Sequence, residues 1–159
     1  MKAGRTNKRA GKKGITSEKA YEFGFRVSLV ARHWRQLNDQ VIRPLNLTDA
    51  VWRPLLHVAR LGKQVNQKQL AQSLGIEGSS LARLIDQLEE QGLIRRIEAP
   101  QDRRAKLISL TDRGNAVVTA VQTRIGESHS ELLSEITEQD LENCMQILDR
   151  IEAKLLERL

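Results

Sequence analysis

The sequence is poor in several residue types, and each scarcity narrows the class of protein. It contains one cysteine, Cys144, so no disulfide forms within the chain, which fits a reducing compartment. It has three prolines and almost no alternating strand-like runs, which predicts a mainly helical fold. Aromatic residues make up 3%, so we expect a core of Leu, Ile and Val. No apolar run approaches the length of a membrane span and no signal-peptide core follows the basic start, which predicts a cytoplasmic protein.

The sequence also lacks the residue patterns of catalysis and of metal binding. It shows no Gly-rich phosphate loop, carboxylate dyad or nucleophile elbow. Its histidines, His33, His57 and His129, do not have the spacing of metal ligands. We interpret His57 as a half-buried packing residue, and Cys144 as a core residue on an apolar stripe rather than a redox sensor. The sequence therefore predicts neither an enzyme nor a bound cofactor or metal.

The net charge of +6 is distributed unevenly along the 159 residues. Residues 1–14 hold six basic residues and no acidic one, and residues 53–113 hold eleven basic and seven acidic residues. Residues 114–159, in contrast, hold four basic and nine acidic residues. A positive first half with a negative end points to a polyanionic partner such as DNA. We expect residues 1–15 to form a disordered basic arm, which either contacts DNA or only aids solubility.

Residues 67–93 carry the pattern of two helices joined by a tight turn. Leu70 and Leu74 have helical spacing, and Gly75 suits the left-handed backbone position that ends the first helix. A second helix follows, whose exposed side is expected to present two hydroxyls and one long cation. These three residues, which suit phosphates and base edges, are Ser79, Ser80 and Arg83. The spacing is that of a helix-turn-helix, the alternative being a helical hairpin that only packs.

Two short strand-like runs follow, at residues 93–98 and 106–110, with a turn predicted at 99–105. Two strands directly after a helix-turn-helix are typical of a winged helix. The turn is expected to place Arg103 and Arg104 at an exposed tip, where they reach phosphates or a minor groove. The alternative is a solvated hairpin loop with no partner.

Long helices with apolar stripes are predicted on both sides of this region. The first of them starts near residue 17, and the last one runs to the end of the chain. The final stripe is more apolar than a lone terminal helix would keep exposed, so we expect it to pack against the first helix and a second copy. The residues expected at this dimer interface are Phe23, Val27, Val30, Leu148, Ile151 and Leu155. The sequence thus predicts a mainly α fold with a small β wing: a winged helix-turn-helix at 47–111 and a helical dimerisation region at 16–46 and 112–159.

Particular residues along this pattern resemble the MarR family of bacterial transcription regulators, and its SlyA branch most closely. They are Trp34-Arg35, Arg43-Pro44-Leu45, Leu47-Thr48, Trp52, Gln69-Leu70-Ala71, Gly75-Ile76-Glu77, Asp86-Gln87-Leu88-Glu89, Gly92-Leu93-Ile94, Asp102-Arg103-Arg104-Ala105-Lys106 and Leu110-Thr111. The likeness is dense over residues 30–111, weaker over 112–159, and absent from the basic arm.

The resemblance implies a homodimer whose two winged helices read a palindromic operator in double-stranded DNA. By position, the major-groove role falls on Ser79, Ser80 and Arg83, and the minor-groove role on Arg103. Such a protein is expected to be a nucleoid-associated repressor or anti-silencer.

The resemblance further implies a crevice beside the winged helix, where some members of the family bind aromatic acids. Arg32 and His33 lie off the apolar stripe of the first helix, so they are expected to hold a carboxylate there, with Trp52 covering the ring. A small aromatic carboxylate would then release the protein from DNA. The alternative is that both side chains are solvated, with Arg32 paired to an acid such as Glu22 or Asp39.

Two other functions remain open from the sequence alone. The basic arm also suits an architectural nucleoid protein that binds DNA for shape and charge, without a ligand. A winged helix can also serve only for packing, in an enzyme or a carrier of small molecules. A footprint on DNA that depends on half-site spacing would argue against the architectural protein. Loss of DNA affinity on removal of Arg103 would argue against the enzyme or carrier.

Overall fold

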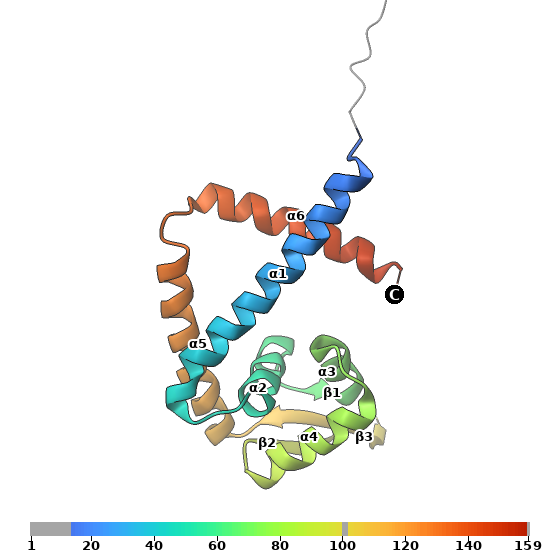
Figure 1. The fold of residues 1–159 in the computed structure, drawn as a ribbon. Helices are drawn as coiled ribbons and strands as arrows, with labels where there is room; N and C mark the ends of the chain where they lie inside the picture. The colour runs from blue at the N-terminus through green and yellow to red at the C-terminus, as the bar shows by residue number, and fades with distance from the viewer. Residues whose placement is uncertain (1–13, 100–101, 159) are drawn as a thin grey trace, which may run out of the picture. The chain divides into compact units, whose positions relative to one another are not determined.

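The computed structural model describes residues 14–99 and 102–158, with the backbone alone described at Ala99 and at residues 102–105. The elements, in order, are α1 (Ser17–Ile42), the 3-10 helix η1 (Arg43–Leu45), α2 (Asp49–Leu61), β1 (Val65–Asn66), α3 (Gln67–Leu74), α4 (Gly78–Glu90), β2 (Ile94–Ala99), β3 (Asp102–Leu110), α5 (Asp112–Leu132) and α6 (Glu138–Leu156) (Figure 1). The predicted class, mainly α with a small β wing, is confirmed. The chain divides into two compact units between Leu37 and Asn38, and each is described by itself.

The winged helix is built around one apolar core that α2, α3, α4 and the sheet share. Its completely buried side chains are aliphatic, in keeping with the low aromatic content, because burial of Leu, Ile and Val removes apolar surface from water. Those with the least exposure are Leu55, Val58, Val65, Leu70, Leu81, Ile85, Leu88, Ile94 and Ile108.

The helix ends follow the capping residues that the sequence offers. Asn66 accepts a hydrogen bond from the Gln69 backbone at 2.7 Å, and its own N–H donates to Gln69 Oε1 at 3.3 Å, which makes a capping box at the start of α3. Thr111 caps α5 by accepting from the N–H of Gly114 at 3.0 Å. Gly75 ends α3 with φ +66°, the left-handed conformation expected of it.

The wing is the outer part of a three-stranded antiparallel sheet in the order β1-β3-β2. The prediction of a turn over residues 99–105 is wrong, because Ala99 pairs with Asp102 and the strands continue almost to the tip. Arg103 and Arg104 therefore belong to β3. Backbone pairing in a hairpin does not depend on apolar side chains, so a charged sequence such as Asp-Arg-Arg can still form a strand.

A second core cluster lies within the unit that begins at Asn38. Ile42, Trp52 and Val121 are its buried members, so it joins the end of α1 to α2 and α5. In α6, by contrast, no described side chain is buried. The expectation that Cys144 is a core residue is wrong, since the thiol is exposed. Within the described part of the chain, no helix is long and apolar enough to cross a membrane.

Candidate nucleic-acid interface

Helix α4 is anchored by one face and leaves the other open to solvent. Leu81, Ile85 and Leu88 recur at helical spacing and are buried in the winged-helix core. On the other side Ser79, Ser80 and Arg83 are exposed, as the sequence predicts. Among the described residues none of these three side chains has a hydrogen-bonding partner, so all three are available to an external ligand.

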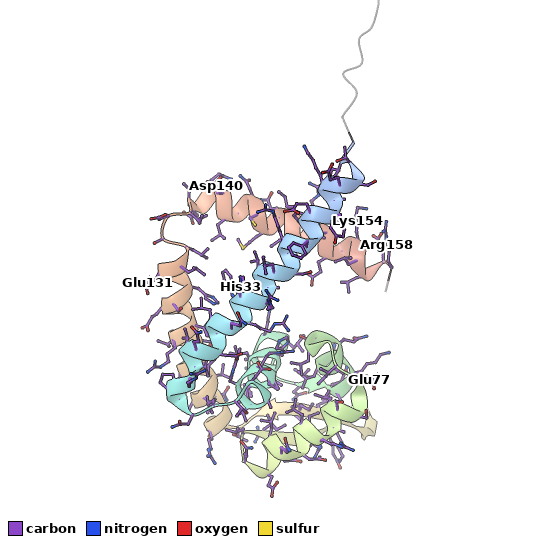
Figure 2. All side chains as sticks on the ribbon, in the orientation of Figure 1. His33, Glu77, Glu131, Asp140, Lys154 and Arg158 are labelled. Atoms are coloured by element: carbon purple, nitrogen blue, oxygen red, sulfur yellow. The ribbon has the colours of Figure 1, made fainter. Side chains whose placement is uncertain are left out.

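The start of α4 also offers backbone donors. Glu77, labelled in Figure 2, directly precedes the helix. Its backbone is extended, and its side chain makes no capping hydrogen bond. The first N–H groups of an α-helix have no partner inside the helix and carry its positive dipole end. Together with Ser79 and Ser80, they form the kind of surface that contacts DNA phosphates.

The turn between α3 and α4 is held in place from α2. Arg53 donates to the carbonyl oxygen of Leu74, at the end of α3, at 3.2 Å and to Asp49 at 3.3 Å. Ile76, partly buried, donates its N–H to Ala71 O at 3.1 Å and packs against the core. The angle between the two helices is therefore fixed by both packing and hydrogen bonds.

Arg96 joins α4 to the wing, a role that was not predicted from the sequence. Its guanidinium forms ion pairs with Asp86 and Glu89 of α4, and its backbone N–H donates to Glu89 Oε1 at 3.0 Å. These contacts, with the hydrogen bond to Asp86 first, raise the pKa of Arg96 above its ordinary value. A period of two from buried Ile94 puts residue 96 on the α4 side of β2, which is the signal that could have revealed the contact.

We predict that Arg96→Ala lowers the melting temperature of the protein, whereas Arg95→Ala does not. Arg96 bonds two carboxylates of α4, but these groups are partly exposed, so the expected loss of stability is about 1 kcal/mol. Arg95 is the neighbouring strand residue, and its side chain has no partner among the described residues, so its removal should change stability by under about 0.5 kcal/mol. Thermal unfolding of both variants, followed by circular dichroism, would test this; equal melting temperatures would contradict it.

The side chains of Arg103 and Arg104, predicted to bind DNA, lie outside the part of the structure described in atomic detail. Their backbone is in β3, next to the wing tip. Closer to the base of the wing, Lys106 Nζ lies 3.4 Å from Glu98 Oε1, an exposed pair that contributes little to stability.

The three residues predicted to bind a ligand have different environments. Arg32 and His33 are exposed on α1, and Glu22 pairs with Arg26 at 2.6 Å instead of with Arg32. Trp52 is only 4% exposed and packs against Ile42 and Val121. The ring of Trp52 is thus covered by the core of its own unit, whereas Arg32 and His33 are open to solvent.

His57 is a packing residue, as interpreted from the sequence. Its Nδ1 lies 2.6 Å from Ser73 Oγ, so the two side chains share a hydrogen bond between α2 and α3. Burial, followed by the charges of Arg53 and Arg60, lowers the pKa of His57, which keeps the ring neutral at neutral pH. Among the described residues, no three His, Cys, Asp or Glu side chains gather in the manner of metal ligands.

An open recognition helix behind a tight turn, followed by a wing, defines a winged helix-turn-helix DNA-binding protein. A model of the MarR family matches residues 45–105. The transcriptional regulator PA3341 is 39% identical, with 85% of this chain and 98% of that chain covered and a TM-score of 0.78. The chain therefore belongs to the MarR family, and it is a DNA-binding transcriptional regulator and not an enzyme.

Two more distant structures have the same fold and were solved with a ligand or with DNA. CouR from Rhodococcus jostii RHA1, bound to p-coumaroyl-CoA, is 26% identical, with 83% of this chain and 92% of that chain covered and a TM-score of 0.72. A mutant of MarR from E. coli, complexed with operator DNA, is 22% identical, with 87% of this chain and 99% of that chain covered and a TM-score of 0.70.

Proposed function

We propose that this protein is a homodimeric regulator of the SlyA-like branch, which reads a palindromic operator and acts as a repressor or anti-silencer on cytoplasmic DNA. The observation that carries the proposal is the open face of α4, where Ser79, Ser80 and Arg83 are exposed on a helix whose other side is fixed in the core. Residues placed in this way enter a major groove without disturbing the fold. Arg83 would donate to a base edge, and the two hydroxyls to phosphates.

The wing supplies a second contact in this proposal. Arg103 and Arg104 are next to the tip of a two-stranded hairpin, and Arg96 ties that hairpin to α4. A wing that moves with the recognition helix can insert one arginine into the adjacent minor groove while α4 occupies the major groove. The 22%-identical MarR structure, solved with operator DNA, supports DNA as the partner.

The dimer in this proposal covers apolar side chains that each unit leaves exposed. On α1, the exposed fractions run from 40% for Val27 to 57% for Val30, with Phe23 also exposed. On α6, Leu148 and Leu155 are about half exposed and Ile151 partly so. Apolar rows of this length on two helices are unusual on a monomer and suit an interface. In our assignment, residues 16–46 and 112–159 form the dimerisation region, and residues 47–111 bind DNA.

We also propose release from DNA by a small aromatic acid, with Arg32 and His33 as the groups that hold its carboxylate. Both are exposed on α1, and an Arg fork can bind a carboxylate through two parallel hydrogen bonds. CouR, which binds p-coumaroyl-CoA, is a relative with an aromatic acyl ligand. For release, the acid must bind the DNA-free form more tightly than the DNA-bound form.

The DNA contacts can be tested by alanine substitution at fixed salt. The operator would first be located by sequencing the DNA bound across the genome and by footprinting. Arg83→Ala and Arg103→Ala should each weaken operator binding by about 1–3 kcal/mol, as for a well-placed arginine contact, without changing the fold. Arg124→Ala, which removes an exposed cation of α5, is the matched control and should leave affinity unchanged. Fluorescence anisotropy would measure all three; affinities within twofold of wild type for Arg83→Ala would overturn the assignment of α4.

A further inference from the structure

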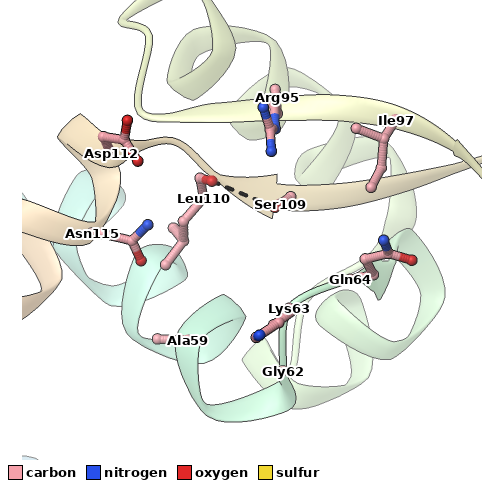
Figure 3. Close-up of a pocket in the computed structure, with 10 residues that line it drawn as sticks. All are labelled: Ala59, Gly62, Lys63, Gln64, Arg95, Ile97, Ser109, Leu110, Asp112 and Asn115. Atoms are coloured by element: carbon pink, nitrogen blue, oxygen red, sulfur yellow. Dashed lines mark hydrogen bonds between the residues drawn. The ribbon is translucent and has the colours of Figure 1, made fainter.

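A hollow of about 520 Å³ lies on the face of the sheet opposite α4 (Figure 3). Arg95 pairs with Ser109 across β2 and β3, so their side chains are on the same face of the sheet. Arg96, the next residue of β2, projects to α4, so Arg95 and Ser109 project to the opposite face, where the hollow lies. The end of α2, the segment before β1 and the start of α5 complete the walls. Every wall belongs to the unit that begins at Asn38.

Two cations enter this hollow from different elements. Lys63 comes from the segment before β1, and Arg95 from β2; in Figure 3 their nitrogen-bearing ends approach the space from opposite walls. Neither side chain has a hydrogen-bond or ion-pair partner within the described part of the chain. Asp112 is the one acidic residue of the lining, so the lining carries a net charge of +1. The positive dipole end of α5, where Asp112 lies, adds to the attraction for an anion.

The rest of the lining is divided between apolar and hydrogen-bonding groups. Ala59, Ile97 and Leu110 supply apolar surface, and Gln64 and Asn115 supply amide side chains that hydrogen-bond in either direction. Ser109 adds a hydroxyl, which donates to Leu110 O at 3.4 Å and can accept from a ligand. A volume of this size is in the range of sites for small molecules. Among the described residues, the charge of Arg96 is matched by the carboxylates of Asp86 and Glu89, whereas the charge of Arg95 is left for a ligand.

We propose that this hollow is a binding site for a small organic anion with one carboxylate and an apolar body. The Arg95 guanidinium can bind a carboxylate in two parallel hydrogen bonds, and Lys63 adds a point charge. One negative charge on the ligand balances the net charge of +1 of the lining. A dianion such as phosphate would leave the occupied site with a net charge of −1 and would be repelled by Asp112. The hydrocarbon body lies against Ile97 and Leu110. This site does not depend on the proposed DNA-binding function, and none of its residues is on α1.

The test is a titration of the free, full-length protein with benzoate, followed by NMR. The signals that report on the hollow are the side-chain amide of Asn115, the Nε–H of Arg95 and the backbone N–H of Ser109. The backbone N–H signals of α1 are followed in the same spectra, because they report on the site proposed for effector release. Benzyl alcohol supplies the same ring without the charge, acetate the charge without the ring, and inorganic phosphate the dianion. The variants are Lys63→Ala/Arg95→Ala, Asp112→Asn and the control Arg124→Ala.

Benzoate should shift all three signals with saturation, and acetate, benzyl alcohol and phosphate should each bind at least about fivefold more weakly. Lys63→Ala/Arg95→Ala should lose at least about tenfold in benzoate affinity, and Asp112→Asn should gain about twofold to fivefold, since it removes an opposing charge. Arg124→Ala should bind as wild type does. Wild-type affinity in the double variant, or tighter binding of phosphate than of benzoate, would overturn the proposal. So would benzoate shifts confined to α1, the site proposed for effector release.

Discussion

Gly114→Ala is expected to destabilise the protein by about 3 kcal/mol or more, among the largest effects of any single substitution in the described chain. A Cβ on Gly114 would overlap the backbone carbonyl oxygen of Leu93 and come within 3.1 Å of its carbon. That carbonyl also accepts a hydrogen bond from the N–H of Thr111 at 3.1 Å. Thr111 Oγ1 in turn donates to Gly92 O at 2.7 Å and accepts from the Gly114 N–H. Backbone is therefore held on both sides of the clash, and neither side can move without losing these bonds.

The matched control is the same substitution twelve residues later in the same helix, Gly126→Ala. No heavy atom lies within 4 Å of a Cβ built at Gly126, so only the helical preference for alanine acts there. That preference should stabilise the protein by about 0.5–1 kcal/mol. Urea unfolding of both variants gives the two free energies of unfolding. Two changes of the same sign would show that the packing at Leu93 does not decide the outcome.

The helices of this fold could be predicted from the sequence because their signals are local. Thr111 and Asn66 are N-caps followed by donors at the right spacing, and Gly75 ends α3 in a left-handed conformation. The buried face of α4 follows from the spacing of Leu81, Ile85 and Leu88 alone. For the same reason the sequence suffices to identify Ser79, Ser80 and Arg83 as exposed residues.

What the sequence did not reveal depends on contacts between distant segments. The two-residue strand β1 exists only because Val65 pairs with Ile108, forty-three residues later, so no local pattern could mark it. Arg96 looks like a surface charge until Asp86 and Glu89 are placed beside it. Lys63 and Arg95 similarly share one hollow only through the pairing of the strands.

Burial was the other point on which the sequence misled. A tryptophan near the start of α2 suited a ligand as well as a core, and only the structure shows that Trp52 packs against Ile42 and Val121. Cys144 is on a helix with an apolar stripe, but α6 buries none of its described side chains in this chain alone. A periodic pattern shows which residues share a face, but it does not show what covers that face.

Leu148→Asp should convert the proposed dimer to a monomer and remove specific DNA binding. Leu148 is 44% exposed on the stripe that we assign to the dimer interface, so in a single chain it has little to lose by becoming charged. Inside an interface the same carboxylate would be desolvated without a partner. A palindrome holds two half-sites about 34 Å apart, which one chain cannot reach. A monomer binds only one half-site, so it loses the second half-site that the dimer holds at high effective concentration. This loss should lower operator affinity at least about a hundredfold.

Gln146→Asp introduces the same charge on α6, two residues away and on a different side of the helix from Leu148. Gln146 is exposed and lies off the apolar stripe, so this variant should remain a dimer and bind the operator as wild type does. Sedimentation velocity would give the oligomeric state of both variants, and anisotropy with the full operator and with a half-site would give their affinities. A Leu148→Asp protein that stays dimeric and protects both half-sites would exclude this face of α6 from the interface. A monomer that still binds the full operator with wild-type affinity would show instead that DNA binding does not need the dimer.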